Sequence, residues 1–391
     1  MNTICLFIDQ LQSAALSAYG NTWFETPAID RLAAEAFLCE QAMATSDSIP
    51  TALGAYLHGR RSADAVGESL ARLLDRAGRD TIFLSDRADW VDGADDFDRS
   101  LSLLSIADNE TPAAPAESLA DSHVGRCFAT LIDQLEACRS DGSPFFLFSL
   151  VGSLGTCWDA PLESAQYLLD EDDPPSYSET APPRLELAAG FDPDELLPIA
   201  TAYAAQVMAV DACLGVLLDH LDQWEAEQPE TAPVLVLGSP RGYRLGEHRL
   251  VGPSSSKEDD LPYSETIHVP LMIRRPDRCG ATTRTQSLVE PCDLYATLGQ
   301  WCGVETPPTT GRDLTPLMEL EPTEWRDAIR VDTPHARAIR THEWYYIEPT
   351  DERRPVLYAK PDDRFEVNDV ANRCRSEMEE LEERMEKLQQ E

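Results

Sequence analysis

Short apolar runs alternate with longer stretches of helical spacing along most of the chain. Nearly continuous apolar runs predict strands that are buried on both faces of a sheet. These runs cover residues 4–8, 81–84, 144–151, 233–237 and 269–273. Apolar residues three and four positions apart predict helices over 26–37, 67–78 and 201–224, and the first begins with Thr26 as a cap before Pro27. This alternation predicts an α/β fold with a mostly parallel sheet that is flanked by helices on both faces.

The pattern changes after about residue 311, where the elements become shorter. Residues 336–347 and 356–358 predict strands of a small subdomain, so we divide the chain into 1–310 and 311–391. The terminal helix carries an apolar seam with intervals of three, four and three. The seam consists of Met378, Leu381, Met385 and Leu388. It has two interpretations, packing on the protein's own body or pairing of two copies into a homodimer.

Composition and charge restrict the classes of partner. The chain has 391 residues, of which 42% are hydrophobic, enough for a sizeable core. It carries 70 acidic and 32 basic side chains, and this net charge of −38 repels nucleic acid and anionic membranes. A protein partner that responds to this charge is expected to be basic. No continuous apolar run is long enough to span a bilayer, so we expect no membrane partner.

Ten cysteines are scattered along the chain without a CxxC pair. In a chain of this length, scattered thiols indicate small buried apolar residues in a reducing compartment rather than a disulfide framework. The N-terminal apolar run is short and ends in an acid, as a buried strand does and a signal peptide does not. We therefore expect a cytoplasmic protein.

Seven segments, in order from residue 3 to about residue 372, resemble motifs of the sulfatase family. They read FIDQLQSAALSAYGN, TPAIDRLAAEA, SDSIPTALGAYLHGR, VLVLGSPRGYRLGEH, YSETIHVPLMIRRP, VEPCDLYATLGQWCGVETPP with GRDLTPLM, and VLYAKPDDRFEVNDVAN. The resemblance implies the alkaline-phosphatase-like fold, in which a small antiparallel sheet with a helix follows a large α/β domain. It implies nothing by itself about activity, which has to be argued from the site.

The resemblance also implies a particular chemistry. Sulfatases hold a divalent cation with four oxygen-bearing side chains and surround the sulfate with Lys, Arg and His. Their nucleophile is a Cys or Ser oxidised to formylglycine, and the metal acts as a Lewis acid. Hard cations such as calcium prefer carboxylate oxygens.

The metal positions of the family are largely replaced in this sequence. The paired aspartates correspond to Asp9 and Gln10, and the late Asp-His or Asp-Asn pair corresponds to Pro240 and Arg241. One carboxylate therefore remains of three, and an Arg stands at a ligand position. We predict no cofactor, and calcium only if the chain is an active hydrolase. An unpaired buried carboxylate is costly, so we predict an Asp9–Arg241 ion pair; the alternative is that Arg241 points into solvent.

The nucleophile position of the family is occupied by Ser48, but the Arg that ends the motif is Ala52. Ser48 has two interpretations, a nucleophile or precursor of one, and a cap of the following helix. Lys257 is the candidate for the family's late Lys, which would be the second catalytic residue.

The anion-binding positions of the family are also changed. The Lys and His of its GKWH-like segment correspond to Asp86 and Ala88, and its mid-chain His corresponds to Gly155. His58 takes the place of a Thr and is a candidate pocket residue with Asp86, Gly155 and Arg241. A carboxylate in a sulfate pocket would repel the substrate.

Three functions follow from these observations. The first is a sulfatase-like pseudoenzyme with a binding or regulatory role. The second is an active sulfuric or phosphoric ester hydrolase with a remodelled site that uses Ser48. The third is a structural or assembly protein that uses the terminal helix.

Overall fold

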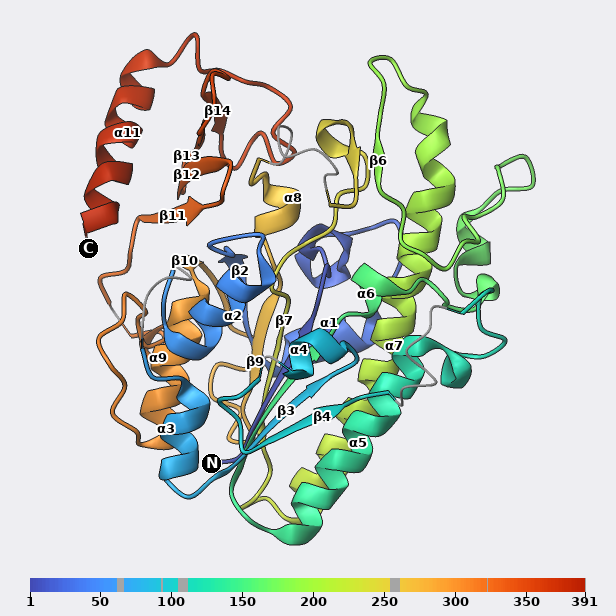
Figure 1. The fold of residues 1–391 in the computed structure, drawn as a ribbon, viewed down its shortest axis with the longest axis vertical. Helices are drawn as coiled ribbons and strands as arrows, with labels where there is room; N and C mark the ends of the chain where they lie inside the picture. Colours follow the sequence, from blue (N-terminus) through green and yellow to red (C-terminus); the bar gives the residue numbers. More distant parts are fainter. Residues whose placement is uncertain (62–66, 93, 105–111, 254–260, 322, 391) are drawn as a thin grey trace.

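The computed structural model describes residues 1–391 except 62–66, 93, 105–111, 254–260, 322 and 391. Its centre is an eight-stranded sheet in the order β10-β2-β9-β7-β1-β5-β3-β4, with helices on both faces (Figure 1). A four-stranded antiparallel sheet and a helix follow at the C-terminal end. The predicted fold class, an α/β domain with a small C-terminal antiparallel sheet, is confirmed.

The middle of the large sheet is parallel. β1 (Thr3–Ile8) pairs with β5 (Phe145–Val151) on one side and with β7 (Val234–Gly238) on the other, and β3 (Asp80–Ser85) follows β5. All residues of β1, β5 and β7 are buried, as their continuous apolar runs predict. The fifth predicted strand, β9 (Leu271–Arg274), is present but runs antiparallel to β7.

Three strands of the large sheet have no signal among the apolar runs. β4 (Arg99–Ser102) and β10 (Arg284–Val289) are the edge strands, and most of their residues are at least half-exposed or polar. β2 (Phe37–Ala42) lies between β10 and β9 and ends in the polar residues Glu40 and Gln41. A strand that faces solvent does not need a continuous apolar run, so its pattern is weak.

The two faces of the sheet are covered by different helices. Apolar residues of α1 (Pro27–Glu35), α5 (His123–Asp141) and α7 (Leu197–Glu227) form one core. Those of α2 (Ile49–His58), α3 (Leu70–Arg76) and α9 (Pro291–Cys302) form the other core, together with the C-terminal sheet. The remaining short elements are α4 (Ala88–Asp92), α6 (Ser153–Thr156), α8 (Ser264–Ile267), α10 (Thr315–Met318) and the paired strands β6 (Leu185–Glu186) and β8 (Leu250–Val251).

The segment around α7 has the length and apolar character of a membrane helix. Pro193–Glu227 has a mean hydropathy of 1.6 in its most apolar window, but 78% of that window is buried inside the protein. A search for continuous apolar runs overlooks this segment because polar residues interrupt it. Its burial among the other helices is that of a core helix.

The start of α1 is held by α7 rather than by its own cap residue. Thr26 precedes the helix as predicted, but its hydroxyl makes no cap bond. Instead, the Asp211 carboxylate of α7 accepts the backbone N–H groups of Ala28 at 3.2 Å and Ile29 at 2.8 Å. A carboxylate at a helix N-terminus is favourable because it meets free N–H groups and the positive end of the helix dipole.

The C-terminal sheet is an antiparallel meander. β11 (Ala328–Asp332), β12 (Ala336–Thr341), β13 (Trp344–Pro349) and β14 (Val356–Ala359) pair in sequence order, so the predicted strand over 336–347 is two strands joined by a turn. On α11 (Arg375–Gln390), Leu381 and Met385 are buried against residues of this sheet. The terminal seam therefore packs on the protein's own body, which confirms the first of its two interpretations.

All ten cysteines are free, and seven of them are buried. This matches the expectation of small buried apolar residues.

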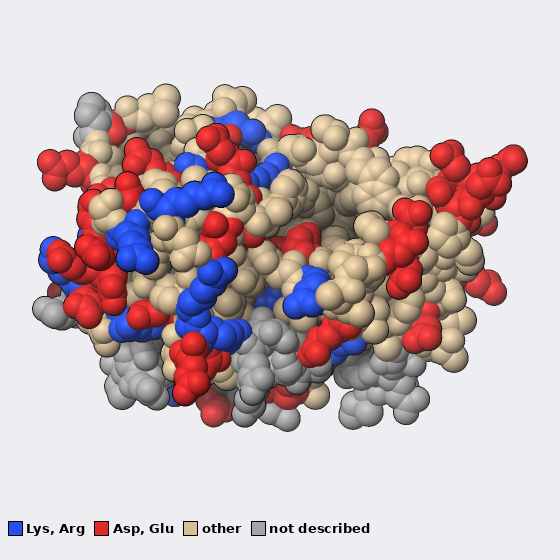
Figure 2. Space-filling view, turned by 90° about the horizontal axis from the view of Figure 1, so that it is seen from above, with Lys and Arg blue, Asp and Glu red and all other residues tan. Residues whose placement is uncertain are grey.

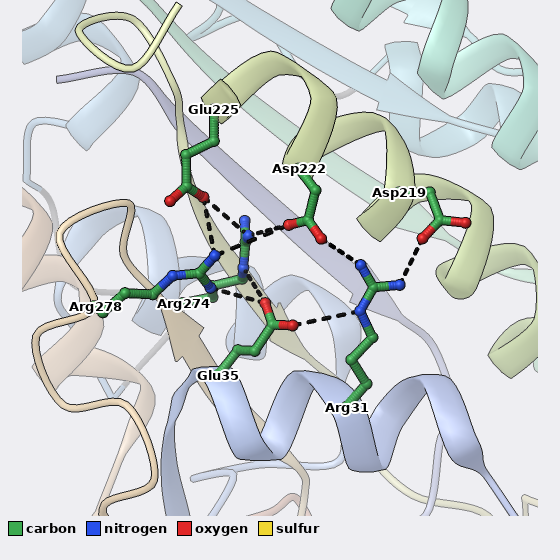
Figure 3. A network of polar contacts seen from close by, with 7 residues as sticks. All are labelled: Arg31, Glu35, Asp219, Asp222, Glu225, Arg274 and Arg278. Carbon is green, nitrogen blue, oxygen red and sulfur yellow. Dashed lines mark hydrogen bonds and ion pairs between the residues drawn. The ribbon is translucent and has the colours of Figure 1, made fainter. Parts of the chain in front are cut away.

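An ion-pair network ties β9 to α1 and α7 (Figure 3). Arg274, at the end of β9, is 1% exposed and donates to Glu35 at 2.8 Å, Asp222 at 2.5 Å and Glu225 at 3.0 Å. Desolvation raises the pKa of Glu35, but hydrogen bonds from Arg278 and Arg274 outweigh it and hold the pKa below its usual value. The network consists of Arg31, Glu35, Asp219, Asp222, Glu225, Arg274 and Arg278.

We predict that Arg274→Gln lowers the free energy of unfolding by about 3 kcal/mol, because it leaves acidic side chains around a buried position without their cation. Arg278→Gln is the matched control, since Arg278 forms ion pairs with the same three acids but is 39% exposed. It is expected to cost less than about 1 kcal/mol. Urea unfolding measures the free energy of unfolding of both variants. Equal losses would show that Arg274 contributes no more to the network than Arg278 does.

Candidate functional site

The candidate site lies at the carboxyl edge of the central strands. Asp9 follows β1, Asp86 follows β3, Gly152 follows β5, and Arg241 comes three residues after β7. Because β7, β1, β5 and β3 are neighbours in the sheet, these residues are brought to one edge. Ligands of open α/β sheets bind outside this edge. Figure 2 looks onto this side of the molecule, and its surface is hollowed near the middle.

Asp9 and Arg241 form a two-bond ion pair. Arg241 Nε lies 2.9 Å from Asp9 Oδ1, and a terminal nitrogen of its guanidinium lies 3.0 Å from Asp9 Oδ2. The other terminal nitrogen donates to the carbonyl of Asp47 at 3.2 Å. The Asp9 side chain is 2% exposed and that of Arg241 is 24% exposed. The predicted ion pair is therefore formed, and the alternative with Arg241 in solvent is wrong.

Gln10 lies beside this pair in a strained conformation. Its φ of 64° is in the left-handed region, which a residue other than glycine enters at a cost of about 1 kcal/mol or more. The Tyr203 hydroxyl of α7 stabilises the turn, because it donates to the carbonyl of Gln10 at 2.8 Å and accepts from the N–H of Gln12 at 3.0 Å. The Gln10 side chain is buried, and within the described residues its Oε1 has no hydrogen-bond partner.

The backbone of Gly155 packs against the side chains of Asp9 and Gln10. A Cβ at this position would come within 2.9 Å of Asp9 Oδ2 and 3.0 Å of Gln10 Nε2. A larger residue here would therefore have to displace the Asp9 carboxylate or the Gln10 amide. The structure brings Gly155, Asp9, Gln10 and Arg241 together, as the sequence predicts.

Asp86 lies at the same edge but is fully engaged with its neighbours. Its Oδ1 accepts the backbone N–H of Gly152 at 2.7 Å, and its Oδ2 lies 2.7 Å from Nε2 of His123. His123 begins α5, and its own backbone N–H donates to the Asp159 carboxylate. No role for His123 is predicted from the sequence. The signal for the pair is that Asp86 comes two residues after a predicted strand, and nothing in the sequence links it to a residue 37 positions away.

The Asp86–His123 pair lies close to the thiol of Cys127. Ligand atoms of Asp86, His123 and Cys127 lie within 4.8 Å of one another. Burial raises the pKa of the Cys127 thiol well above its usual value. Asp86 and His123 already satisfy each other in a direct hydrogen bond. The arrangement fits a buried hydrogen-bonded pair.

Ser48 immediately precedes α2, but its side chain makes no cap hydrogen bond. The capping interpretation of its hydroxyl is therefore wrong, although its carbonyl accepts the N–H of Ala52 at 2.9 Å and so begins the helix. Ser48 is half-buried and follows Asp47, whose carbonyl binds Arg241. The start of α2 is thus attached to the ion pair. Lys257 lies outside the described residues.

His58 is not part of this group. It ends α2, and ten residues of helix place it about 15 Å from Ser48. Its Nδ1 lies 3.0 Å from the carbonyl of Gly67 and its Nε2 lies 3.4 Å from Asp96. The motif gives His58 a sequence position near Ser48, but the helix carries the side chain away from the edge.

The residues present do not fit the divalent cation that the family resemblance implies. Both oxygens of Asp9 accept hydrogen bonds from Arg241. Gln10 offers a neutral amide in place of a carboxylate, and Pro240 offers no side-chain ligand. A guanidinium carries the positive charge at this position and cannot be deprotonated.

The sulfatase family model matches residues 1–304, so this chain belongs to the sulfatase family. An N-acetylglucosamine-6-O-sulfatase of Bacteroides thetaiotaomicron is 28% identical over 175 residues, which cover 43% of this chain and 29% of that relative. The chain thus matches less than a third of the relative's length.

Solved structures show the same fold at low identity. The phosphonate monoester hydrolase of Agrobacterium radiobacter has a TM-score of 0.78 at 18% identity, with 99% of this chain and 95% of that chain covered. BT4656 in complex with its substrate D-glucosamine-2-N,6-O-disulfate has a TM-score of 0.75 at 17% identity, with 100% and 97% covered. These similarities establish the fold.

We predict strong coupling between Asp9 and Arg241 in a double-mutant cycle. Arg241→Met is expected to lower the free energy of unfolding by about 3 kcal/mol, because it leaves the Asp9 carboxylate buried and unpaired. Adding Asp9→Asn should recover part of that loss, with a coupling energy of about 2 kcal/mol.

The pair Arg87–Asp89 is the matched control for this cycle. It has the same two-bond geometry, at 2.9 and 2.7 Å, but its side chains are 39% and 61% exposed. Its coupling is expected to stay below about 1 kcal/mol. Additive losses at Asp9 and Arg241 would show that the pair does not stabilise the edge.

Proposed function

We propose that this sulfatase-family protein has lost ester hydrolysis and acts as a binding or regulatory protein. The observation that carries the proposal is the two-bond contact between Arg241 and Asp9. It places a fixed guanidinium against the carboxylate that would otherwise bind the family's cation. Without a metal, the site lacks the Lewis acid that stabilises charge on a reacting ester.

The surroundings of Ser48 also support the proposal. A serine hydroxyl becomes a nucleophile when a base or a metal removes its proton. The histidine at this edge, His123, is buried and faces Asp86. Within the described part of the chain, no hydrogen bond joins the Ser48 hydroxyl to a base.

Two polar groups at this edge support a binding role. Arg241 is partly exposed, and the buried Oε1 of Gln10 has no partner within the described residues. A polar ligand that donates a hydrogen bond to this amide oxygen would remove the cost of leaving it unsatisfied. We therefore propose that the hollow at the carboxyl edge binds a polar small molecule without transforming it.

A remodelled hydrolase is the second candidate. Ser48 favours it, because its hydroxyl is not used as a cap and lies one residue from the Asp47 carbonyl that binds Arg241. The relatives include an N-acetylglucosamine-6-O-sulfatase and a phosphonate monoester hydrolase. In this alternative, the Ser48 oxygen attacks the sulfur or phosphorus atom, the hydroxyl proton passes to the departing ester oxygen, which leaves as an alcohol, and water then hydrolyses the serine ester.

An assembly role through the terminal helix has less support. Leu381 and Met385 are buried within the protein, so the seam is not available to a second copy. A homodimer or a basic partner would have to use the polar side of α11, which carries acidic side chains on most of its turns.

Hydrolysis assays separate the first two candidates. Aryl sulfate, aryl phosphate and a phosphonate monoester are incubated with the wild-type protein and with Ser48→Ala. We expect no turnover that depends on Ser48, so any residual rate should be the same in both proteins. Turnover that Ser48→Ala reduces a hundredfold or more would reject the proposal and establish the hydrolase.

A variant in which the family's metal ligands are restored provides a third protein for the hydrolysis assay. Gln10→Asp, Pro240→Asp and Arg241→Asn together restore the family's carboxylates and amide. If the lost metal site is what removed Lewis-acid chemistry, the triple variant is expected to bind calcium. Turnover by the wild-type protein in the presence of a chelator would show instead that the chain uses a route without metal.

A further inference from the structure

A second cavity, of about 470 Å³, is lined by basic side chains and by none of the residues of the Asp9–Arg241 pair. It lies between the turn after β1, strand β2 and the C-terminal subdomain. Its walls include Glu40, Gln41, Arg284, Arg340, Lys360 and Arg364. In Figure 2, Lys and Arg side chains gather on the half of this face where the C-terminal subdomain lies.

The charge of the cavity is opposite to that of the chain. Arg284, Arg340, Lys360 and Arg364 line it, whereas Glu40 is the one carboxylate among its lining residues. The whole chain has 70 acidic and 32 basic side chains. Cations that lie close together repel one another, and a bound anion removes that repulsion.

Arg340 is buried without a carboxylate partner among the described residues. It is 6% exposed, and its guanidinium donates to the carbonyl of Thr341 at 2.7 Å and to the side-chain oxygen of Gln41 at 3.1 Å. Desolvation lowers its pKa to about 10. The Glu366 carboxylate, which pairs with Lys360, partly offsets this effect. A buried cation whose direct hydrogen bonds go to neutral oxygens is costly.

The other three cations differ in their partners. Lys360 pairs with Glu366 at 2.8 Å, and Arg284 pairs with Glu40 at 3.4 Å. Arg364 donates to the carbonyl of Tyr19 at 3.3 Å and, within the described residues, forms no ion pair. Two of the four cations therefore form an ion pair, whereas Arg340 and Arg364, among the described residues, are not compensated by a carboxylate in direct contact.

We propose that this cavity is a binding site for a small organic phosphate. Two uncompensated guanidiniums match the two negative charges of a phosphate monoester, whereas a sulfate monoester carries one. Planar guanidiniums suit the oxygens of a tetrahedral anion because each offers paired N–H groups.

The remaining lining residues fit the organic part of such a ligand. Ala18, Met43 and Pro361 provide apolar surface beside the cations. The cavity volume is in the range of small-molecule sites. This inference concerns a different cavity from the one at the carboxyl edge, so it stands or falls independently of the proposed function.

Glucose 6-phosphate, glucose 6-sulfate and glucose serve as probes in calorimetric titrations at constant ionic strength and neutral pH. We expect saturable binding of the phosphate, at least tenfold weaker binding of the sulfate, and none of glucose. Arg364→Gln changes an exposed residue, and it is expected to weaken phosphate binding about tenfold through loss of charge-assisted hydrogen bonds. Arg340→Met should abolish binding if the variant folds.

Two control variants locate the site. Arg76→Gln removes an exposed cation that pairs with Glu68 and does not line the cavity, so it should leave binding unchanged. Asp9→Asn with Arg241→Met should also leave it unchanged. The proposal is overturned if the wild-type protein does not bind the phosphate, if Arg364→Gln binds it as tightly as wild type does, or if only the Asp9/Arg241 variant loses it.

Discussion

The carboxylate of Asp9 requires a cation, and the identity of that cation determines what the edge of the sheet can do. Asp9 ends the central strand, where its side chain is 2% exposed and cannot be stabilised by water. Arg241 supplies the positive charge from the loop after the neighbouring strand, and its other terminal nitrogen donates to the carbonyl of Asp47. One guanidinium therefore joins the ends of β1 and β7 to the start of α2. A divalent cation at this place would need the same carboxylate oxygens.

The family membership and this edge are compatible because fold and site depend on different residues. The buried strands, the helices on both faces and the C-terminal sheet maintain the architecture that the solved sulfatase and phosphonate hydrolase structures share. The chemistry of the edge depends on a few side chains that can change without disturbing those cores. Gly155 leaves room for the Asp9 carboxylate where a larger residue would collide with it, and the Asp86 carboxylate lies 2.7 Å from Nε2 of His123. Asp9 and Asp86 therefore each have hydrogen-bond partners at this edge.

The sequence predicted elements well where burial imposes a pattern and poorly where partners come from distant parts of the chain. β1, β5 and β7 are continuous apolar runs because both of their faces are covered, whereas the edge strands β4 and β10 lack that constraint. The Asp9–Arg241 pair was predictable because a buried carboxylate needs a counterion and the motifs placed the two residues together. Thr26 and Ser48 were wrong as side-chain caps, since Asp211 of α7 takes the role of the first and the Ser48 hydroxyl makes no cap hydrogen bond. The Asp86–His123 contact and the position of His58 depend on contacts between distant parts of the chain, which local sequence motifs do not reveal.

Thermal unfolding with calcium, magnesium or a chelator tests the central claim most directly. A protein that holds a site ion gains about 3 kcal/mol at a hundredfold excess of the ion over its dissociation constant, which shifts the midpoint visibly. Our account predicts that neither ion nor chelator shifts the midpoint of the wild-type protein at constant ionic strength. A saturable increase with calcium that Asp9→Asn abolishes would contradict it, because the ion would then displace Arg241 from the Asp9 carboxylate.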